Sequence, residues 1–135
     1  RFKELIIMCI FCKIINKEIP SSVVYEDEDF LAILDLSQAT KGHTIVMPKK
    51  HSDNLLEADD DVLSKYLIVV KRVMKKLDES FHPSGFNVLN NCKEMAGQSV
   101  LHTHIHVIPR YEINDITIKF TEHKVDLNEV LKEIK

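Results

Sequence analysis

The run His102-Thr103-His104-Ile105-His106-Val107-Ile108 sets three histidines in alternation with apolar or β-branched residues. A period of two is the period of a β-strand, so we expect the three imidazoles to project from one face of a strand that Pro109 ends. Three imidazoles on one face are costly to bury without partners, which makes a solvated polar face the weaker interpretation. The run therefore indicates a functional site, either a metal cage or a catalytic cluster.

The composition bounds the class of protein. The 135 residues are 44% hydrophobic and 29% charged, which is typical of one soluble globular domain with an adequate core. The net charge of -3 gives no basic surface for nucleic acid, and no apolar stretch is long enough to span a membrane. Three cysteines without a signal peptide favour a reducing compartment, so we expect a cytoplasmic protein. We expect residues 8–135 to form the single domain and residues 1–7 to be an N-terminal extension.

Apolar periodicity predicts the secondary structure. Strands are expected at 21–26, 30–34, 43–47, 86–90 and 99–108. Short helices are expected at 11–18 and after Asp126, where a capping box precedes an apolar stripe that should pack against another part of the protein. A long helix is expected at 60–80, with the apolar stripe Val62, Leu63, Tyr66, Leu67, Val70, Val73, Met74, Leu77 and Phe81. Antiparallel neighbours plus one long helix make an α+β architecture.

Cys9-Ile10-Phe11-Cys12 has three interpretations: a redox pair, one half of a zinc site, or two inert buried thiols. A redox pair needs a βαβ context with an accessible thiol of low pKa, and no strand is expected before this segment. Zinc needs two further ligands, which the histidines of the chain could supply. The spacing favours zinc over redox chemistry and leaves all three interpretations open.

Together these segments resemble the histidine triad (HIT) family, whose motif is His-φ-His-φ-His-φ-φ with φ apolar. Residues 102–108 match it, with Thr103 only partly apolar. Residues 96–100 are similar to the phosphate loop of the family, and 30–35 with 42–51 resemble its N-terminal half. The segment Cys9-Ile10-Phe11-Cys12-Lys13-Ile14 looks like the opening of the zinc-containing, bacterial-type members, similar to the histidine triad nucleotide-binding hydrolases. Gln38 departs from the proline that many members have near that position.

The resemblance implies a nucleotide site. His104 would attack the α-phosphorus of a nucleotide to form a nucleotidyl-imidazole intermediate that water hydrolyses, and its other ring nitrogen would donate to a backbone carbonyl. His106 and His43 would flank the phosphate. The substrate-binding residues would be Asp35 at the ribose, Ile33 and Leu34 at the base, Asn91 near the ribose and phosphate, and Gly97, Gln98 and Ser99 in the phosphate loop.

The resemblance also implies a metal and an assembly. A structural zinc ion would be held by Cys9, Cys12, His51 and His102 as a closed Cys2His2 set. The family fold is a five-stranded antiparallel sheet with one long helix and short terminal helices, and two copies form a homodimer with a continuous ten-stranded sheet.

The implied activity is hydrolysis of a nucleoside phosphoramidate or a dinucleoside polyphosphate, with a purine nucleotide or nucleoside phosphate as the expected partner. The alternative is a nucleotide-sensing or scaffold protein with low residual activity.

Overall fold

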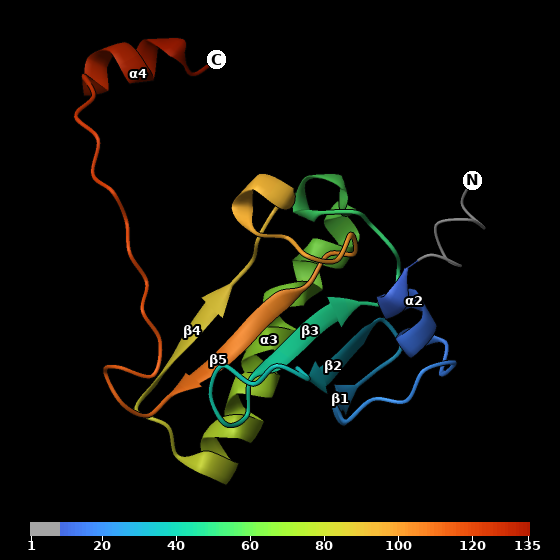
Figure 1. Cartoon of the computed structure of the whole chain (residues 1–135). Coiled ribbons are helices and arrows are strands. Elements are labelled where there is room, and N and C mark those ends of the chain that lie inside the picture. Colours follow the sequence, from blue (N-terminus) through green and yellow to red (C-terminus); the bar gives the residue numbers. More distant parts are fainter. Residues whose placement is uncertain (1–8) are drawn as a thin grey trace.

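The computed structural model describes residues 9–135, so the N-terminal extension expected at residues 1–7 lies outside the described residues. One antiparallel sheet has the strand order β1-β2-β3-β5-β4 (Figure 1). Its strands are β1 (Val23–Glu26), β2 (Phe30–Leu34), β3 (Thr44–Pro48), β4 (Gly85–Leu89) and β5 (Ile105–Arg110). The helices are α2 (Ile10–Ile15), α3 (Asp60–Phe81) and α4 (Leu127–Glu133), with short 3-10 turns η1 (Leu55–Glu57) and η2 (Glu94–Ala96). The predicted α+β architecture with five antiparallel strands is confirmed.

Both faces of the sheet are covered. Alternate residues of β2 point in opposite directions, so they pack in two different clusters. Phe30 and Ala32 pack in the cluster under α3, whereas Leu31 and Ile33 pack in the cluster that contains Phe11 of α2. A strand that is buried on both faces has no polar side, which explains the continuous apolar runs of β2 and β3. The α2 face is the one that carries the functional side chains described below.

Helix α3 covers the opposite face and differs in two residues from its predicted apolar stripe, since Val69, which was not predicted, is buried and Leu67 is not. Tyr66, Val70, Val73 and Leu77 are buried as expected, but Leu67 is 67% exposed. Successive helical residues are 100° apart, so Leu67 lies well to the side of the stripe that Tyr66 begins. Among residues 9–135, no helix is long and apolar enough to cross a membrane.

The fifth strand was predicted too early, since β5 begins at Ile105 rather than at residue 99 and continues through Pro109 to Arg110. The N–H of Thr103 is bonded to the Ser52 carbonyl of a loop, not to a neighbouring strand. Pro109 does not end the strand because the ladder does not need its missing N–H. Its carbonyl accepts from the Thr40 hydroxyl, and in an antiparallel strand the N–H and C=O of one residue point the same way.

The C-terminal segment leaves the body of the molecule. Residues 111–126 contain no helix or strand, and α4 stands apart from the sheet (Figure 1). The predicted cap is confirmed, since Asp126 accepts hydrogen bonds from the N–H groups of Asn128 and Glu129. The expected packing of this helix is not made within residues 9–135, where Leu127 and Leu131 of α4 stay exposed.

Candidate metal centre and histidine site

The three triad histidines lie on the α2 face, although only His106 belongs to β5. The Phe11 ring of α2 meets the His102 and His104 rings edge-on, with centroids 5.9 and 5.0 Å away. The His104 and His106 rings lie 5.1 Å apart. The residues Ile105 and Val107 join the core under α3 instead. The alternation expected from the sequence is therefore confirmed, even where the backbone is not a strand.

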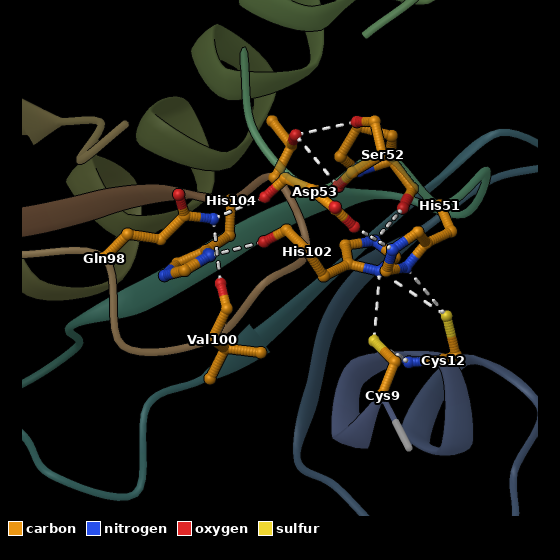
Figure 2. A network of polar contacts seen from close by, with 11 residues as sticks. Cys9, Cys12, His51, Ser52, Asp53, Gln98, Val100, His102 and His104 are labelled. Atoms are coloured by element: carbon orange, nitrogen blue, oxygen red, sulfur yellow. Dashed lines mark hydrogen bonds and ion pairs between the residues drawn. The ribbon is translucent and has the colours of Figure 1, made fainter. Parts of the chain in front are cut away.

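Four side chains converge at the N-terminal end of α2: Cys9, Cys12, His51 and His102 (Figure 2). Cys9 is the N-cap of the helix and Cys12 lies in its first turn, so the helix brings the two sulfurs close together. The loop after β3 supplies His51, and the segment before β5 supplies His102. All four ligand atoms lie within 4.8 Å of one another. The structure thus brings together the whole ligand set that the resemblance implied.

The spacing of these atoms suits a tetrahedral metal ion. The Nδ1 atom of His102 lies 3.4 Å from Sγ of Cys9 and 3.6 Å from Sγ of Cys12. The Nδ1 atoms of His51 and His102 are 3.1 Å apart, and Nδ1 of His51 is 3.3 Å from Sγ of Cys12. Tetrahedral zinc with sulfur and nitrogen ligands has nitrogen–sulfur edges of about 3.6 Å and nitrogen–nitrogen edges of about 3.4 Å. A cluster of two thiols with two imidazoles fits a metal better than a redox pair or inert thiols.

Hydrogen bonds fix both histidines in the form that a metal ligand needs. Nε2 of His102 donates to the Pro48 carbonyl at 2.7 Å, and Nε2 of His51 donates to Oδ1 of Asp53 at 2.8 Å. Both oxygens only accept, so each ring carries its proton at Nε2 and keeps the lone pair of Nδ1 for the cluster. Burial lowers the pKa of His102 to about 4, which keeps the ring neutral. Burial, with the adjacent Cys9 thiol, raises the pKa of Cys12 to about 12, so a thiolate there needs a cation beside it.

His104 has the opposite arrangement of ring nitrogens. Its Nδ1 donates to the His102 carbonyl at 2.7 Å, so the lone pair lies on Nε2, for which no hydrogen-bond partner is found among residues 9–135. Asn90 holds the backbone at this point by donating from Nδ2 to the His104 carbonyl at 3.0 Å. Burial lowers the pKa of His104, which favours the neutral ring. A neutral imidazole with a free lone pair is a competent nucleophile.

His43 and His106 form a directly bonded pair beside His104. Nε2 of His43 lies 2.9 Å from Nδ1 of His106, and Nδ1 of His43 accepts from the backbone N–H of Ala39 at 3.1 Å. Oδ2 of Asp35 lies 3.5 Å from Nε2 of His43 and 3.9 Å from Nδ1 of His106. Burial, followed by the neighbouring His104 and His43 rings, lowers the pKa of His106 to about 4. The nucleophile candidate therefore has a hydrogen-bonded histidine pair and the side chain of Asp35 as neighbours.

The conformation of the expected phosphate loop is held by hydrogen bonds between its own Gln98 side chain and the backbone. Gln98 is buried, and its amide donates to the carbonyls of Asp53 and Val100 and accepts from the Lys93 N–H. Its side chain therefore binds loop backbone in this conformation and does not point at an open phosphate position. Gly97 has a φ of +100°, a conformation that residues with a side chain rarely adopt. Ser99 is exposed.

The other expected substrate residues lie in two places, with Ile33 and Leu34 at the C-terminal end of β2 and Asn91 beside Gly97. Ile33 is buried in the cluster beside α2, whereas its neighbour Leu34 is partly exposed. Because adjacent strand residues point to opposite faces, these two side chains do not line the same surface. Asn91 lies close to Gly97, with Nδ2 3.5 Å from where a Cβ on that glycine would be.

Several functional contacts were missed by the sequence reasoning. Asp53 could have been found, because a carboxylate two residues after a candidate ligand histidine is a plausible outer partner. Phe11 lies between the two cysteines, and no pattern in the sequence around it indicates its contact with His104. Pro48 and Ala39 act through backbone groups, which leave no trace in side-chain chemistry.

Comparison with known proteins places this geometry in context. The HIT domain family model matches residues 16–113. An uncharacterized HIT-like protein of Methanocaldococcus jannaschii is 54% identical over 132 residues, covering 95% of this chain and 99% of that protein. An adenosine 5'-monophosphoramidase of Candida albicans is 43% identical over 106 residues, covering 76% and 70% of the two chains. The crystal structure of a zinc-bound histidine triad family protein from Mycobacterium smegmatis has a TM-score of 0.78 at 33% identity, covering 87% of this chain and 85% of that one.

Proposed function

Because this chain belongs to the HIT domain family, we propose that it is a nucleotide-binding hydrolase that cleaves at the α-phosphate of a nucleoside phosphoramidate or dinucleoside polyphosphate. The observation that carries the proposal is the His104 ring, whose Nδ1 is bonded to a backbone carbonyl while Nε2 keeps a free lone pair. One relative is named an adenosine 5'-monophosphoramidase, which favours a purine nucleoside phosphoramidate as the substrate. The product would be a nucleoside monophosphate.

The reaction would run in two displacements at phosphorus. In the first, Nε2 of His104 forms a bond to the α-phosphorus, and the bond from phosphorus to the amine or phosphate leaving group breaks with its electron pair. The hydrogen bond from Nδ1 to the His102 carbonyl stabilises the positive charge that develops on the ring. In the second, water attacks the nucleotidyl-histidine and releases His104. In the first displacement, an amine leaving group takes up a proton through His106 and His43. In the second, the attacking water gives a proton back to this histidine pair.

Substrate contacts would come from the loops around His104. The exposed Ser99 and the backbone beside Gly97 would bind phosphate oxygens, with Asn91 next to them. Asp35 would accept hydrogen bonds from the ribose hydroxyls, and Ile33, which lies on the α2 face, would border the base. Gln98 would act through the shape it gives the loop, since its amide is bonded to three backbone groups.

A turnover assay would test the proposal. An adenosine 5'-phosphoramidate and a diadenosine polyphosphate would be offered separately to the wild-type protein, with release of adenosine monophosphate as the readout. Rapid acid or base quench of the faster reaction should trap a nucleotidyl adduct on His104. Binding of adenosine monophosphate without turnover of either compound would reject the hydrolase and support the nucleotide-sensing alternative.

We also propose that zinc is the metal of the Cys9, Cys12, His51 and His102 cluster, supported by the donor set and by the zinc-bound relative. Four protein ligands leave no open position on the ion, so its part would be structural. The ion would tie α2 to the segment before β5, because its ligands come from both. The same segment orients His104, since the His102 carbonyl is the acceptor for Nδ1 of that ring. The cluster would thereby hold the backbone that orients the nucleophile.

Finally, we propose a homodimer with a continuous ten-stranded sheet. β4 is an edge strand of the sheet, and its own residues Val88 and Leu89 are exposed. An exposed edge strand is a template for pairing, and twofold pairing of two β4 strands would join the sheets. Leu67 and Ile68 on the outer side of α3 supply further exposed apolar surface. Light scattering at micromolar concentration should give twice the 15.6 kDa chain mass, and a monomer mass would contradict the proposal.

A further inference from the structure

In the loop between β2 and β3, one hydrogen bond to the His43 ring decides which ring nitrogen carries the proton. The backbone N–H of Ala39 lies 3.1 Å from Nδ1 of His43. A backbone N–H can only donate, so Nδ1 must offer its lone pair and the proton of the neutral ring must lie on Nε2. His43 is buried, so water does not compete freely for this nitrogen.

The proton position on His43 then decides the one on His106. Nε2 of His43 lies 2.9 Å from Nδ1 of His106, and Oδ2 of Asp35, at 3.5 Å, is a longer second acceptor. Because His43 donates from Nε2, Nδ1 of His106 must accept, and His106 must carry its own proton on Nε2. His106 therefore presents a donor at its free edge, next to the ring of His104, which presents a lone pair. The two neighbouring rings are complementary toward a phosphoryl group.

Gln38 holds the loop in the conformation that this chain of hydrogen bonds needs. Its Nε2 donates to the carbonyls of Asp35 and His43, and its Oε1 accepts from the N–H of Gly42 at 2.9 Å. The His43 N–H also donates to the Thr40 carbonyl, and the Thr40 hydroxyl donates to the Pro109 carbonyl of β5. The loop is thereby closed on itself and tied to the sheet, with Ala39 held at the tip facing His43.

We propose that the backbone N–H of Ala39, held in place by Gln38, sets the tautomers of His43 and His106, which makes both loop residues positioning residues. Its catalytic consequence rests on the proposed function, because the Nε2–H of His106 would bond to the negative oxygens of the phosphoryl group. The opposite tautomer of His43, with the proton on Nδ1, would turn the free edge of His106 into an acceptor and repel those oxygens.

The tautomers can be measured directly, without substrate. Long-range proton–nitrogen NMR correlation of the whole protein, labelled with ¹⁵N-histidine, assigns the protonated nitrogen of each ring. At pH 7 the wild type should show His43 and His106 protonated at Nε2. Ala39→Pro, which has no amide hydrogen, should give a mixture of tautomers at both rings, whereas Ala39→Ser should keep the wild-type pattern. A wild-type His43 protonated at Nδ1, or an unchanged pattern in Ala39→Pro, would overturn the proposal.

A second variant tests the part of Gln38 without altering the backbone. Gln38→Glu keeps the size but replaces the donating amide by a carboxylate facing two carbonyl oxygens. We expect mixed tautomers and a kcat about tenfold to a hundredfold lower at an unchanged KM, as for other outer hydrogen-bond partners. Leu36→Ala, at a fully exposed position of the same loop, should change neither.

The two proposals fail in different ways. A wild-type protein that shows the expected tautomers but no turnover would reject the hydrolase and keep the assignment of the protons. Gln38→Glu with wild-type tautomers and wild-type kcat would reject the positioning role of Gln38 while the hydrolase stands.

Discussion

The candidate metal cluster and the proposed reaction site use the same type of side chain in opposite ways, and His102 and His104 show the difference most clearly. Both rings are buried, both face α2, and both touch Phe11. His102 donates from Nε2 to Pro48, so its Nδ1 faces the sulfurs, whereas His104 donates from Nδ1 to the His102 carbonyl, so its Nε2 faces outward. The nitrogen that each ring offers thus follows from the nitrogen that the backbone binds, not from burial or from the place of the histidine in the motif.

The two sites also differ in how their polar atoms are connected. In the metal cluster, two sulfurs and two lone pairs point at one position. In the reaction site, Asp35, His43 and His106 are equally close together, but the two rings bind each other and Nδ1 of His43 accepts from Ala39. No set of lone pairs is left to converge on an ion there. Proximity of ligand-type residues is therefore a weaker indicator of a metal site than the direction of their lone pairs.

The largest expected effect separates the two sites at His104. His104→Asn removes the attacking nitrogen but leaves the four cluster residues intact, so turnover should fall by about four to six orders of magnitude while bound zinc stays unchanged. Single-turnover kinetics and metal analysis measure the two quantities, and calorimetry with adenosine monophosphate should show retained binding. Near-normal turnover, or a trapped adduct on another residue, would refute the mechanism.

The next effect removes the metal instead. Cys12→Ala should lose zinc and lower the melting temperature by roughly 10 °C, because metal binding to a structural site is coupled to folding. Cys92→Ala is the matched control, since Cys92 is a partly buried free cysteine outside the cluster and should keep one zinc per chain. Metal analysis and thermal denaturation distinguish the outcomes. A wild-type protein without zinc and with reactive thiols would contradict the assignment.

A smaller effect is expected at the outer partner of the cluster. Asp53→Ala removes the acceptor that keeps the proton of His51 on Nε2, so zinc affinity should drop about tenfold to a hundredfold. Competition with a chromophoric chelator gives the affinity. Turnover at saturating zinc should remain close to that of the wild type, because the Asp53 carboxylate binds His51 and, among residues 9–135, no hydrogen bond joins it to His104 or His106. An unchanged affinity would show that His51 is held by packing alone.

The smallest effect is a pH dependence of stability from the reaction site. Burial lowers the pKa of His106 to about 4, against an ordinary value of about 6.5 for the unfolded chain. Between these values the unfolded chain binds more protons, so the free energy of unfolding should fall as pH falls from about 6.5 toward 4, by at most about 3 kcal/mol for this group. Urea denaturation of His106→Asn should show a flatter dependence over that range. If the free energy of unfolding has the same pH dependence in both proteins, a group other than His106 titrates in this range.

Much of the fold could be predicted because it depends on local patterns. The apolar runs of β2 and β3, the stripe of α3 and the cap of α4 each follow from residues close in sequence. The start of β5 could not, because the segment before it has strand-like residues but its backbone bonds to the loop at Ser52. The position of α4 could not either, since its apolar stripe finds no surface within residues 9–135.

The sequence by itself determined which residue types meet on the α2 face, since a period of two assigns side chains to faces whatever elements come next. Through the Cys-x-x-Cys spacing and the family resemblance, it also indicated the four residues that the structure brings together in the candidate metal cluster. Only the tertiary structure decided which nitrogen of each imidazole carries the proton and which keeps its lone pair. The deciding groups are the carbonyls of Pro48 and His102 and the N–H of Ala39, and the Pro48 carbonyl lies 54 residues from His102. Every residue type except proline has both backbone groups, so no side-chain pattern could identify the ones that fix these protons.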